Sequence, residues 1–357
     1  MERLVDLRSD TVTEPSPEMR RAMYDAEVGD DYYYDDPTVQ ALEERAAELL
    51  RKEAAMLVLS GTMGNLVSIL AQTHRGDSVV VEETSHVFVN EAGSLATLGG
   101  LTPRTIKGRH GGIEPESVEE AVFPQSILHP PTRMLCIENT HNAAGGYCLS
   151  VETTKSLCRT AAKLGLSVHL DGARIFNAAV ALGVPADELV EDVDSMTFCL
   201  SKGLACPVGS IVLGSRDFIA AARHWRQMVG GGMRQAGVFA AAGLVALDSM
   251  IGRLAEDHAN AKRLATILAD AGLPVDPGEV ETNMVFVEFA EGQTDPAKFV
   301  ANLKDQGVLI NPPRGRRIRF VTHYGISTDD IEFAGDRIGR LFASAAASGG
   351  TARAVSV

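Results

Sequence analysis

The chain has 357 residues with 33 basic and 47 acidic side chains, which gives a formal net charge of −14. A chain this acidic is not expected to bind nucleic-acid phosphates or an anionic membrane surface over a wide area. Its 45% hydrophobic and 22% charged residues are ordinary for a globular protein with a large core. The five cysteines are odd in number and lack C-x-x-C spacing, so we expect no disulfide framework and no metal site.

No segment suggests export or membrane insertion. The amino terminus is charged from Glu2 onward and lacks the apolar stretch of a signal peptide. No apolar run approaches the roughly 20 residues that span a bilayer. We therefore expect a cytoplasmic protein whose partners are small molecules and copies of itself, not nucleic acid or membrane.

Short apolar runs alternate with segments of helical period through the first 250 residues or so. The predicted strands are 56–59, 78–82, 134–138, 167–170, 196–200 and 210–213. Clear helical segments are 38–51, 64–73, 151–164 and 237–251. This alternation is typical of an α/β domain with a mainly parallel sheet and helices on both faces. Such sheets bind ligands at the carboxyl ends of their strands.

The pattern changes after about residue 252. Helices are predicted at 253–271, 296–306 and 328–345, and strands at 283–289, 308–310 and 317–321. We interpret the chain as an amino-terminal segment (1–14), a large domain (15–252), a smaller α+β domain (253–345) and a tail (346–357). The tail is rich in small residues, and we expect it to be disordered.

Lys202 directly follows a predicted apolar strand. Partial desolvation there favours the neutral amine that Schiff-base chemistry requires. Taken alone, a lysine at a strand end more often reaches for water. Asp171 ends another predicted strand, and a carboxylate so placed can keep a pyridine nitrogen protonated. It could equally cap a helix beginning near Arg174.

A possible anion-binding turn precedes the predicted helix 64–73. Gly61 and Thr62 follow an apolar strand, where free backbone amides, a glycine and a hydroxyl could bind a phosphate. The pattern is weak alone, because Ser and Thr also cap helices that bind nothing. A phosphate site, an aspartate and a lysine, each after a strand, form a more specific combination.

Seven segments resemble, in order, the low-specificity L-threonine aldolases, pyridoxal-phosphate enzymes of the aspartate-aminotransferase fold (fold type I). They are DLRSDTVT (6–13), VGDDYYYDDPTV (28–39), SGTMGN (60–65), IENTHN (137–142), HLDGAR (169–174), SKGL (201–204) and GGGMRQAG (230–237). The resemblance implies a seven-stranded sheet in the large domain and pyridoxal 5'-phosphate as cofactor. It also implies cleavage of L-threonine, L-allo-threonine and other β-hydroxy-α-amino acids to glycine and an aldehyde.

The resemblance assigns cofactor contacts to individual residues. Lys202 would bind the cofactor covalently, and Asp171 would pair with its ring nitrogen. Gly61 and Thr62 would hold its phosphate. Further contacts would come from Ser201, Arg174 and Tyr33, from His86 stacked on the ring, and from Arg234 of a neighbouring subunit.

Substrate contacts follow from the same resemblance. His86 and His129 would lie near the substrate hydroxyl, and either could be the base; either could also be an ordinary polar loop residue. Ser9 and Arg319 would bind the substrate carboxylate, with Arg174 assisting. Arg316 and Arg317 lie close enough in sequence to compete with Arg319 for this role.

Two positions depart from the family. Tyr34 stands where the family usually has glycine, so the turn near the cofactor could differ and the pocket could be narrower. Gln227 stands where the family usually has a lysine that reaches toward the cofactor phosphate of the neighbouring subunit. The glutamine removes one positive charge from that site.

Other functions fit parts of the pattern. A β-eliminating lyase would share the lysine, the aspartate and the phosphate turn. A cofactor-binding protein without turnover is less expected, because it would usually carry a DNA-binding extension. A contact from Arg234 across subunits requires at least a dimer, and the family suggests a tetramer of two dimers.

Overall fold

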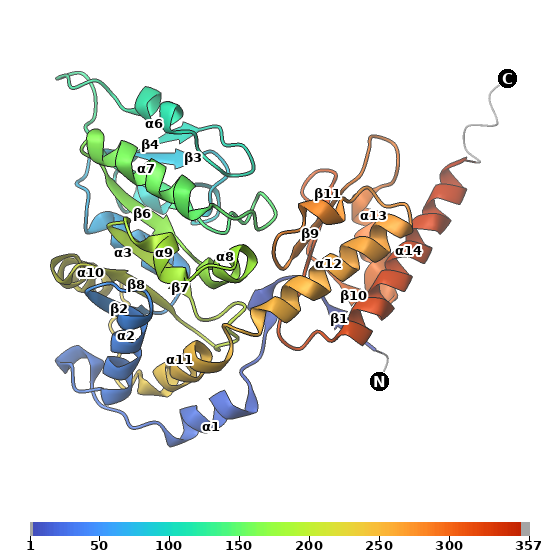
Figure 1. Ribbon diagram of the computed structural model, residues 1–357, viewed down its shortest axis with the longest axis horizontal. Coiled ribbons are helices and arrows are strands. Elements are labelled where there is room, and N and C mark those ends of the chain that lie inside the picture. Colours follow the sequence, from blue (N-terminus) through green and yellow to red (C-terminus); the bar gives the residue numbers. More distant parts are fainter. Residues whose placement is uncertain (1–2, 351–357) are drawn as a thin grey trace. The chain divides into compact units, whose positions relative to one another are not determined.

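The computed structural model describes residues 3–350, and side chains up to residue 345 (Figure 1). The chain forms two compact units. The large unit is Pro15–Gly252, and the small unit joins the chain before Pro15 to the chain from Arg253 onward. Residues 351–357 of the predicted tail lie outside the described residues.

A seven-stranded sheet forms the centre of the large unit. In spatial order its strands are β2 (Ala54–Val58), β8 (Ser210–Gly214), β7 (Ser195–Cys199), β6 (Ser167–Asp171), β5 (Thr132–Glu138), β3 (Ser78–Glu82) and β4 (Thr102–Ile106). Strand β8 is antiparallel to β2 and β7, and the other neighbours pair in parallel. The predicted mainly parallel sheet is confirmed, and all strands but β8 end at one edge, called here the carboxyl edge.

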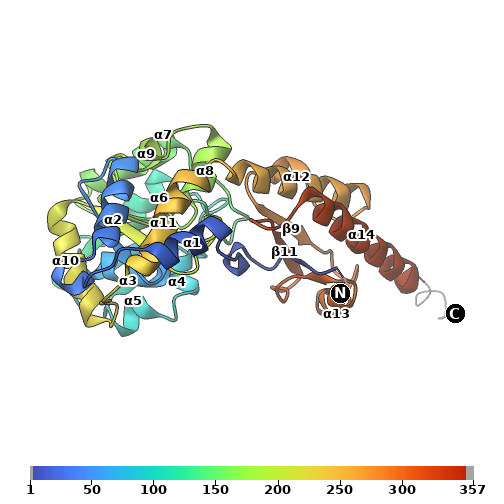
Figure 2. The ribbon, with the colours of Figure 1, turned by 90° about the horizontal axis from the view of Figure 1, so that it is seen from below.

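Helices cover both faces of this sheet (Figure 2). They are α1 (Pro17–Asp25), α2 (Pro37–Leu49), α3 (Gly61–Leu70), α4 (His86–Val89), α5 (Ser94–Thr97), α6 (Pro115–Ala121), α7 (Val151–Lys163), α8 (Ile175–Leu182), α9 (Ala186–Val190), α10 (Arg216–Met228) and α11 (Gly237–Ser249), with the 3-10 turn η2 (Asp31–Tyr33). Helix α3 begins three residues before its predicted start, because Ser60 Oγ caps it by accepting from the Met63 N–H at 3.2 Å.

Two apolar clusters join α3, α4, α5 and α10 to one face of the sheet. Near β3 and β5, buried Val79, Val81 and Met134 pack with residues of α3, α4 and α5. Near β2 and β8, buried Met56 and Val212 pack with α3 and α10. Helix α3 is thus held over the middle of the sheet, with its first turn at the carboxyl edge.

The small unit has its own core and two short sheets. Its elements are β1 (Val5–Asp6), η1 (Asp10–Val12), α12 (Leu254–Asp270), η3 (Pro277–Glu279), β9 (Met284–Glu288), α13 (Pro296–Asp305), β10 (Val308–Leu309), β11 (Arg317–Val321) and α14 (Thr328–Gly350). Strand β1 pairs in parallel with β10, and β9 pairs antiparallel with β11. Helix α14 continues through residues 346–350, which were predicted to belong to the disordered tail.

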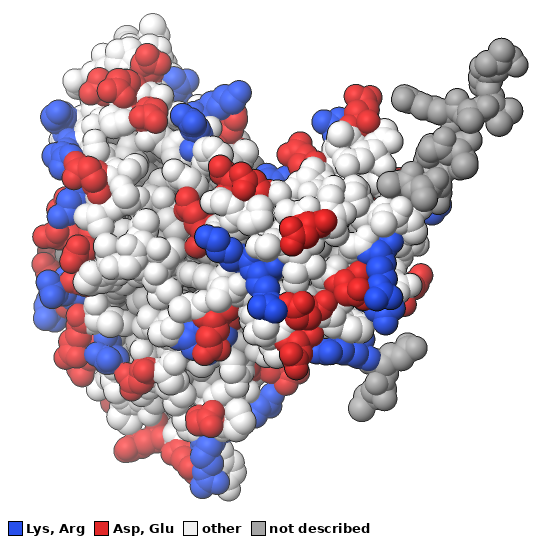
Figure 3. Space-filling model, turned by 45° about the vertical axis from the view of Figure 1, so that its right-hand side comes forward, with Lys and Arg blue, Asp and Glu red and all other residues white. Residues whose placement is uncertain are grey.

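Acidic and basic side chains are interspersed on the face drawn in Figure 3. Within residues 3–350, no single helix is long and apolar enough to cross a membrane, and one bent helix pair passes that test by length and composition only.

Candidate active site

The carboxyl edge of the large sheet brings together several of the side chains singled out by the sequence. Asp171 is the last residue of β6, and Lys202 follows β7. Gly61 and Thr62 follow β2 and open helix α3. His86 opens α4, which follows β3. The topology therefore brings four segments that are distant in sequence to one edge.

Asp171 is a buried acceptor, 3% exposed. Its Oδ2 accepts from Asn65 Nδ2 at 2.8 Å, and its Oδ1 accepts from the backbone N–H of Ala173 at 3.1 Å. Helix α8 begins later, with Arg174 at its N-cap position and no side-chain cap bond. Asp171 therefore does not cap a helix, and its carboxylate remains an acceptor at the carboxyl edge.

His86 forms a close pair with a buried carboxylate. Its Nδ1 lies 2.9 Å from Glu91 Oε1, and Glu91 is 3% exposed. This hydrogen bond is the largest effect that raises the pKa of His86, opposed by partial burial. Burial raises the pKa of Glu91, and the hydrogen bond from His86 opposes that rise. One side-chain nitrogen or oxygen atom from each of His86, Glu91 and Asp171 lies within 4.8 Å of the other two.

Two further buried carboxylates lie next to this group: Glu82 at the end of β3 and Glu138 at the end of β5. Glu138 Oε2 accepts from the backbone N–H of His86 at 2.6 Å. His141 Nε2 lies 3.1 Å from Glu82 Oε2 and 3.8 Å from Glu138 Oε2. Burial lowers the pKa of His141, but the hydrogen bond to Glu82 and the charge of Glu138 outweigh this effect and raise it. The protonated imidazole is therefore favoured between these two carboxylates.

The first turn of α3 is shaped for a close approach. The amides of Gly61 and Thr62 have no intrahelical acceptor, because they open the helix. A Cβ atom at residue 61 would lie only 2.8 Å from Cys199 Sγ, so a larger residue there would have to displace the thiol or the turn. A Cβ at Gly231 would lie 2.5 Å from Met63 Sδ. The glycine-rich loop (residues 230–237) thus packs beside this turn.

Lys202 and Ser201 belong to a tight loop between β7 and β8. The carbonyl of Lys202 accepts from the Ala205 N–H at 2.9 Å. Both Ser201 and Lys202 are partly exposed. On the β6 side, Arg174 is buried, and its Nη1 lies 3.5 Å from Asn142 Oδ1. The structure thus places a lysine and an arginine beside the strand that ends at Asp171.

Tyr33 and Arg234 lie on two loops that contact each other. The carbonyl of Arg234 accepts from the Asp31 N–H at 3.1 Å, and its guanidinium lies 5.0 Å from the centre of the Tyr32 ring. Tyr33 itself is 68% exposed. Buried Arg226 fixes this loop by donating to Asp31 Oδ2 at 2.7 Å. The structure therefore leaves Tyr33 at the surface of its own chain.

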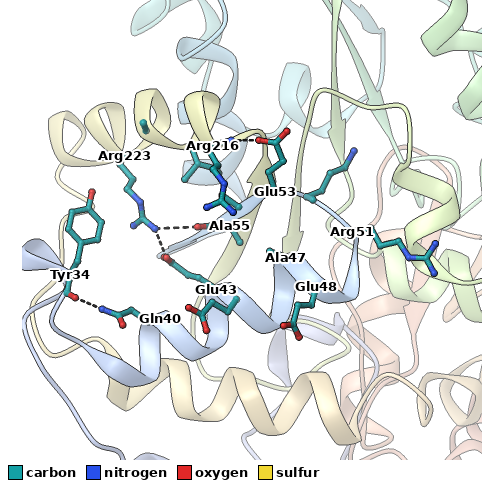
Figure 4. A pocket seen from close by; sticks show the side chains of 15 residues that line it. Tyr34, Gln40, Glu43, Ala47, Glu48, Arg51, Glu53, Ala55, Arg216 and Arg223 are labelled. Atoms are coloured by element: carbon teal, nitrogen blue, oxygen red, sulfur yellow. Dashed lines mark hydrogen bonds and ion pairs between the residues drawn. The ribbon is translucent and has the colours of Figure 1, made fainter.

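The two residues that depart from the family pattern, Tyr34 and Gln227, lie beside the predicted site residues of the carboxyl edge rather than among them. Tyr34 lines a hollow of about 800 Å³ between α2, β2 and α10, where its ring centre lies 5.1 Å from the Arg223 guanidinium (Figure 4). Arg223 also pairs with Glu43. Gln227 lies against Gly232 of the glycine-rich loop. Tyr34 therefore narrows this hollow instead of the carboxyl edge.

His129 is not brought to the other predicted residues within one chain. It precedes β5, whereas the register pairs Glu138, at the other end of β5, with Asp171. A strand of this length separates the two ends by roughly 20 Å. The His129 ring stacks on Phe123 at a centroid distance of 5.2 Å. Its predicted contact with the substrate requires a second copy of the chain.

Ser9 and Arg319 lie on adjoining segments of the small unit. Arg319 Nη2 donates to the carbonyl of Arg8 at 3.4 Å, next to Ser9. Arg317 instead lies 3.6 Å from the centre of the Phe286 ring. Arg316 is exposed and directly precedes β11. Of the three candidate arginines, the structure brings Arg319 to the Ser9 segment.

Three buried residues of this group have no assigned role in the sequence analysis. They are Asn65, Glu91 and Glu138. Asn65 and Glu138 occur inside recognised motifs, but Glu91 does not. A polar Asn65 among the apolar residues of α3 was the available signal, because a buried amide requires partners.

Comparison with known proteins identifies the family. A family model described as beta-eliminating lyase matches residues 6–292. Low-specificity L-threonine aldolase 1 of Arabidopsis thaliana is 46% identical over 337 residues, 93% of this chain and 94% of that protein. The low specificity L-threonine aldolase of Escherichia coli K12 is 44% identical over 329 residues, 92% and 96% of the two chains. The chain belongs to the low-specificity L-threonine aldolase family.

Solved structures give the same fold for this threonine aldolase family member. A Leishmania major threonine aldolase aligns with a TM-score of 0.82 at 17% identity, covering 95% of this chain and 99% of that one. A putative L-allo-threonine aldolase from Listeria monocytogenes aligns with a TM-score of 0.77 at 20% identity, covering 94% and 96%.

The residues at the carboxyl edge fit pyridoxal phosphate, the cofactor of the family. Asp171 offers a buried acceptor for a protonated ring nitrogen, and Lys202 offers an amine for the aldehyde. The turn at Gly61 and Thr62 offers amides and a hydroxyl to a phosphate, and a Cβ at residue 61 would crowd Cys199 Sγ beside this turn. The donors and acceptors thus match the ring, the aldehyde and the phosphate of one cofactor.

Proposed function

We propose that the protein cleaves L-threonine, L-allo-threonine and other β-hydroxy-α-amino acids to glycine and an aldehyde. The observation that carries this proposal is the pair of His86 and Glu91 beside Asp171. A lyase that removes a β-hydroxyl proton needs a base close to the cofactor ring. The names of the relatives favour the same activity.

Bound pyridoxal phosphate accepts the electrons released at the substrate Cα. In this proposal Lys202 binds the cofactor aldehyde, and Asp171 keeps the ring nitrogen protonated. Gly61 and Thr62 donate hydrogen bonds to the phosphate, with Ser201 and Arg174 contributing further contacts. Arg234 and Tyr33 reach the cofactor from a neighbouring copy of the chain.

Substrate orientation selects the bond that breaks. Ser9 and Arg319 hold the substrate carboxylate, and Arg174 assists. A fixed carboxylate aligns the Cα–Cβ bond for cleavage. The bond between Arg319 and the carbonyl of Arg8 supports this choice over Arg316 and Arg317.

His86 takes the hydroxyl proton at Nε2, because Nδ1 is bonded to Glu91. The Glu91 carboxylate then stabilises the imidazolium that forms. Within one chain His86 is therefore the base we propose. His129 keeps a role near the substrate hydroxyl only if a neighbouring copy brings it to the site.

We also propose that the protein forms homo-oligomers, a tetramer of two dimers, and acts in the cytoplasm. Exposed Tyr32, Tyr33 and Met228 near the glycine-rich loop support contact with a second copy, because exposed aromatic clusters mark interfaces. All five cysteines are free and buried, which fits a reducing compartment. Light scattering of the purified protein tests the assembly.

The deciding experiment incubates the holoenzyme with L-threonine, L-allo-threonine and phenylserine. An aldolase releases glycine and an aldehyde in equal amounts. The alternative, a β-eliminating lyase, would release ammonia and a 2-oxo acid. Lys202→Ala should abolish cleavage, and Lys163→Ala, on the exposed end of α7, should not. Ammonia as the product, or turnover by Lys202→Ala, would contradict the proposal.

A further inference from the structure

Asn65 lies between the two buried carboxylates of the site. It is 1% exposed, and its Nδ2 atom lies 2.8 Å from Asp171 Oδ2 and 2.8 Å from Glu91 Oε1. A side-chain amide nitrogen carries two hydrogens, so it can donate one to each carboxylate. A single side chain thereby links the acceptor for the cofactor ring to the partner of His86.

A buried chain of hydrogen bonds fixes the orientation of this amide. Asn65 Oδ1 lies 3.1 Å from His169 Nε2, and His169 Nδ1 lies 2.9 Å from Ser195 Oγ. Gln72 Nε2 donates to Ser195 Oγ at 2.7 Å. Ionised carboxylates only accept, so the Asn65 nitrogen must face them and its oxygen must accept from His169. His169 Nδ1 then accepts from Ser195.

The charge state of His169 agrees with this donor-to-acceptor direction of the hydrogen bonds. Its ring is fully buried, and burial lowers its pKa to about 4. It is therefore neutral near physiological pH and carries one N–H. The chain from Gln72 through Ser195 and His169 to Asn65 has one donor for each acceptor along its length.

We propose that Asn65 is a positioning residue of the aldolase site, whose amide donates to Asp171 and Glu91 at once and holds the first toward the cofactor ring and the second toward His86. The inference rests on the proposed function of this site. Burial and the nearby charge of Asp171 raise the pKa of Glu91, and the hydrogen bonds from His86 and Asn65 oppose that rise. The second N–H of Asn65 holds the Asp171 carboxylate in place at the same time.

Replacing Asn65 should change the pKa of His86 through its effect on Glu91. Glu91 and Asp171 both favour the charged form of His86, whereas Lys202 opposes it. Glu138 also contacts His86, because its carboxylate accepts a hydrogen bond from the His86 backbone N–H. Without the amide, Glu91 binds a proton more readily and holds the His86 proton less strongly. His86 should then become a neutral base at lower pH.

The test compares Asn65→Leu with Ser68→Ala. Both positions are buried on α3, and the Ser68 hydroxyl has no hydrogen-bond partner among residues 3–345. Asn65→Leu should weaken binding of pyridoxal phosphate to the apoenzyme roughly tenfold, the equivalent of one hydrogen bond to a charged group. It should also move the acidic limb of kcat/KM for L-threonine down by about half a pH unit. Ser68→Ala should change neither.

Ser195→Ala provides a second variant that leaves Asn65 in place. It removes the donor to His169 and should shift both readouts in the same direction by a smaller amount. This variant decides the question if Asn65→Leu does not fold. Unchanged cofactor affinity and an unchanged limb would overturn the inference. A wild-type protein that binds the cofactor without cleaving threonine would refute the proposed function, while the affinity comparison would still test Asn65.

Discussion

The backbone N–H of His86 donates to Glu138 Oε2 at 2.6 Å, which ties the start of α4 to the end of β5. The other carboxylate oxygen, Oε1, accepts from the Asn142 N–H at 2.8 Å. Glu138 is 5% exposed. One buried carboxylate therefore holds both the segment that carries His86 and the loop that carries Asn142.

We expect Glu138→Gln to destabilise the protein. The amide nitrogen of glutamine would face one of these backbone N–H groups, and a buried donor without a partner costs about 1–3 kcal/mol. Urea unfolding at neutral pH measures the loss, with exposed Glu83→Gln as the matched control. Equal stability of the two variants would show that Glu138 does not hold these segments.

The pH dependence of activity should report the pair of His86 and Glu91. The hydrogen bond to Glu91 is the largest effect raising the pKa of His86. A base must be neutral, so activity should rise with pH through this pKa. Glu91→Gln lowers the pKa toward its ordinary value, and the acidic limb of kcat/KM should move to lower pH. Profiles over about pH 5 to 9 check this.

Glu83→Gln is again the control for that profile. If the acidic limb of Glu91→Gln coincides with that of the wild type, His86 is not the group that titrates. Loss of activity without a shift would indicate a structural role for Glu91 instead.

The contact between Gly61 and Cys199 can be tested by a compensating substitution. A Cβ at residue 61 would lie 2.8 Å from Cys199 Sγ, so Gly61→Ala should displace the first turn of α3. We expect weaker binding of pyridoxal phosphate, measured by titration of the apoenzyme. Cys199→Ala removes the sulfur and should restore most of the affinity in the double variant. Additive losses would contradict this steric explanation.

Tyr34 adopts the left-handed conformation, with φ 60° and ψ 33°. This conformation costs most residues about 1–2 kcal/mol and glycine very little. Tyr34→Gly should therefore be more stable than Tyr34→Ala by roughly 1 kcal/mol, although both lose the contact with Arg223. Urea unfolding compares the two variants directly. An alanine variant as stable as the glycine variant would exclude backbone strain at this position.

Most of the large sheet could be predicted because its central strands are short, mainly apolar runs that are largely buried. Strand β4 could not, since Thr102–Ile106 is an edge strand with a proline and only one fully buried residue. The short helices α4 and α5 carry too few residues to show a helical period. Helix α14 continues beyond the end of its apolar pattern, so its last turn was not predicted.

The candidate site was predictable where a polar residue lies at or just after the end of a strand, as Asp171 and Lys202 do. The contacts of Asn65 with Glu91 and Asp171 join positions 26 and 106 residues apart. Such contacts depend on how α3 packs over the sheet, which no local pattern specifies. The same holds for His129, whose distance from Asp171 follows from strand direction rather than from its motif.

The reversed direction of β8 determines how Lys202 is attached to the sheet. Strands β7 and β8 are adjacent and antiparallel, so the chain returns directly after Cys199 without crossing a helix. The Leu200 N–H donates to the Gly209 carbonyl at 3.0 Å, which closes this loop on itself. Asp171 instead leads into helix α8. A protein engineer could therefore rebuild residues 203–208 to change the reach of the amine while the helix connections that carry Asp171 and His86 stay intact.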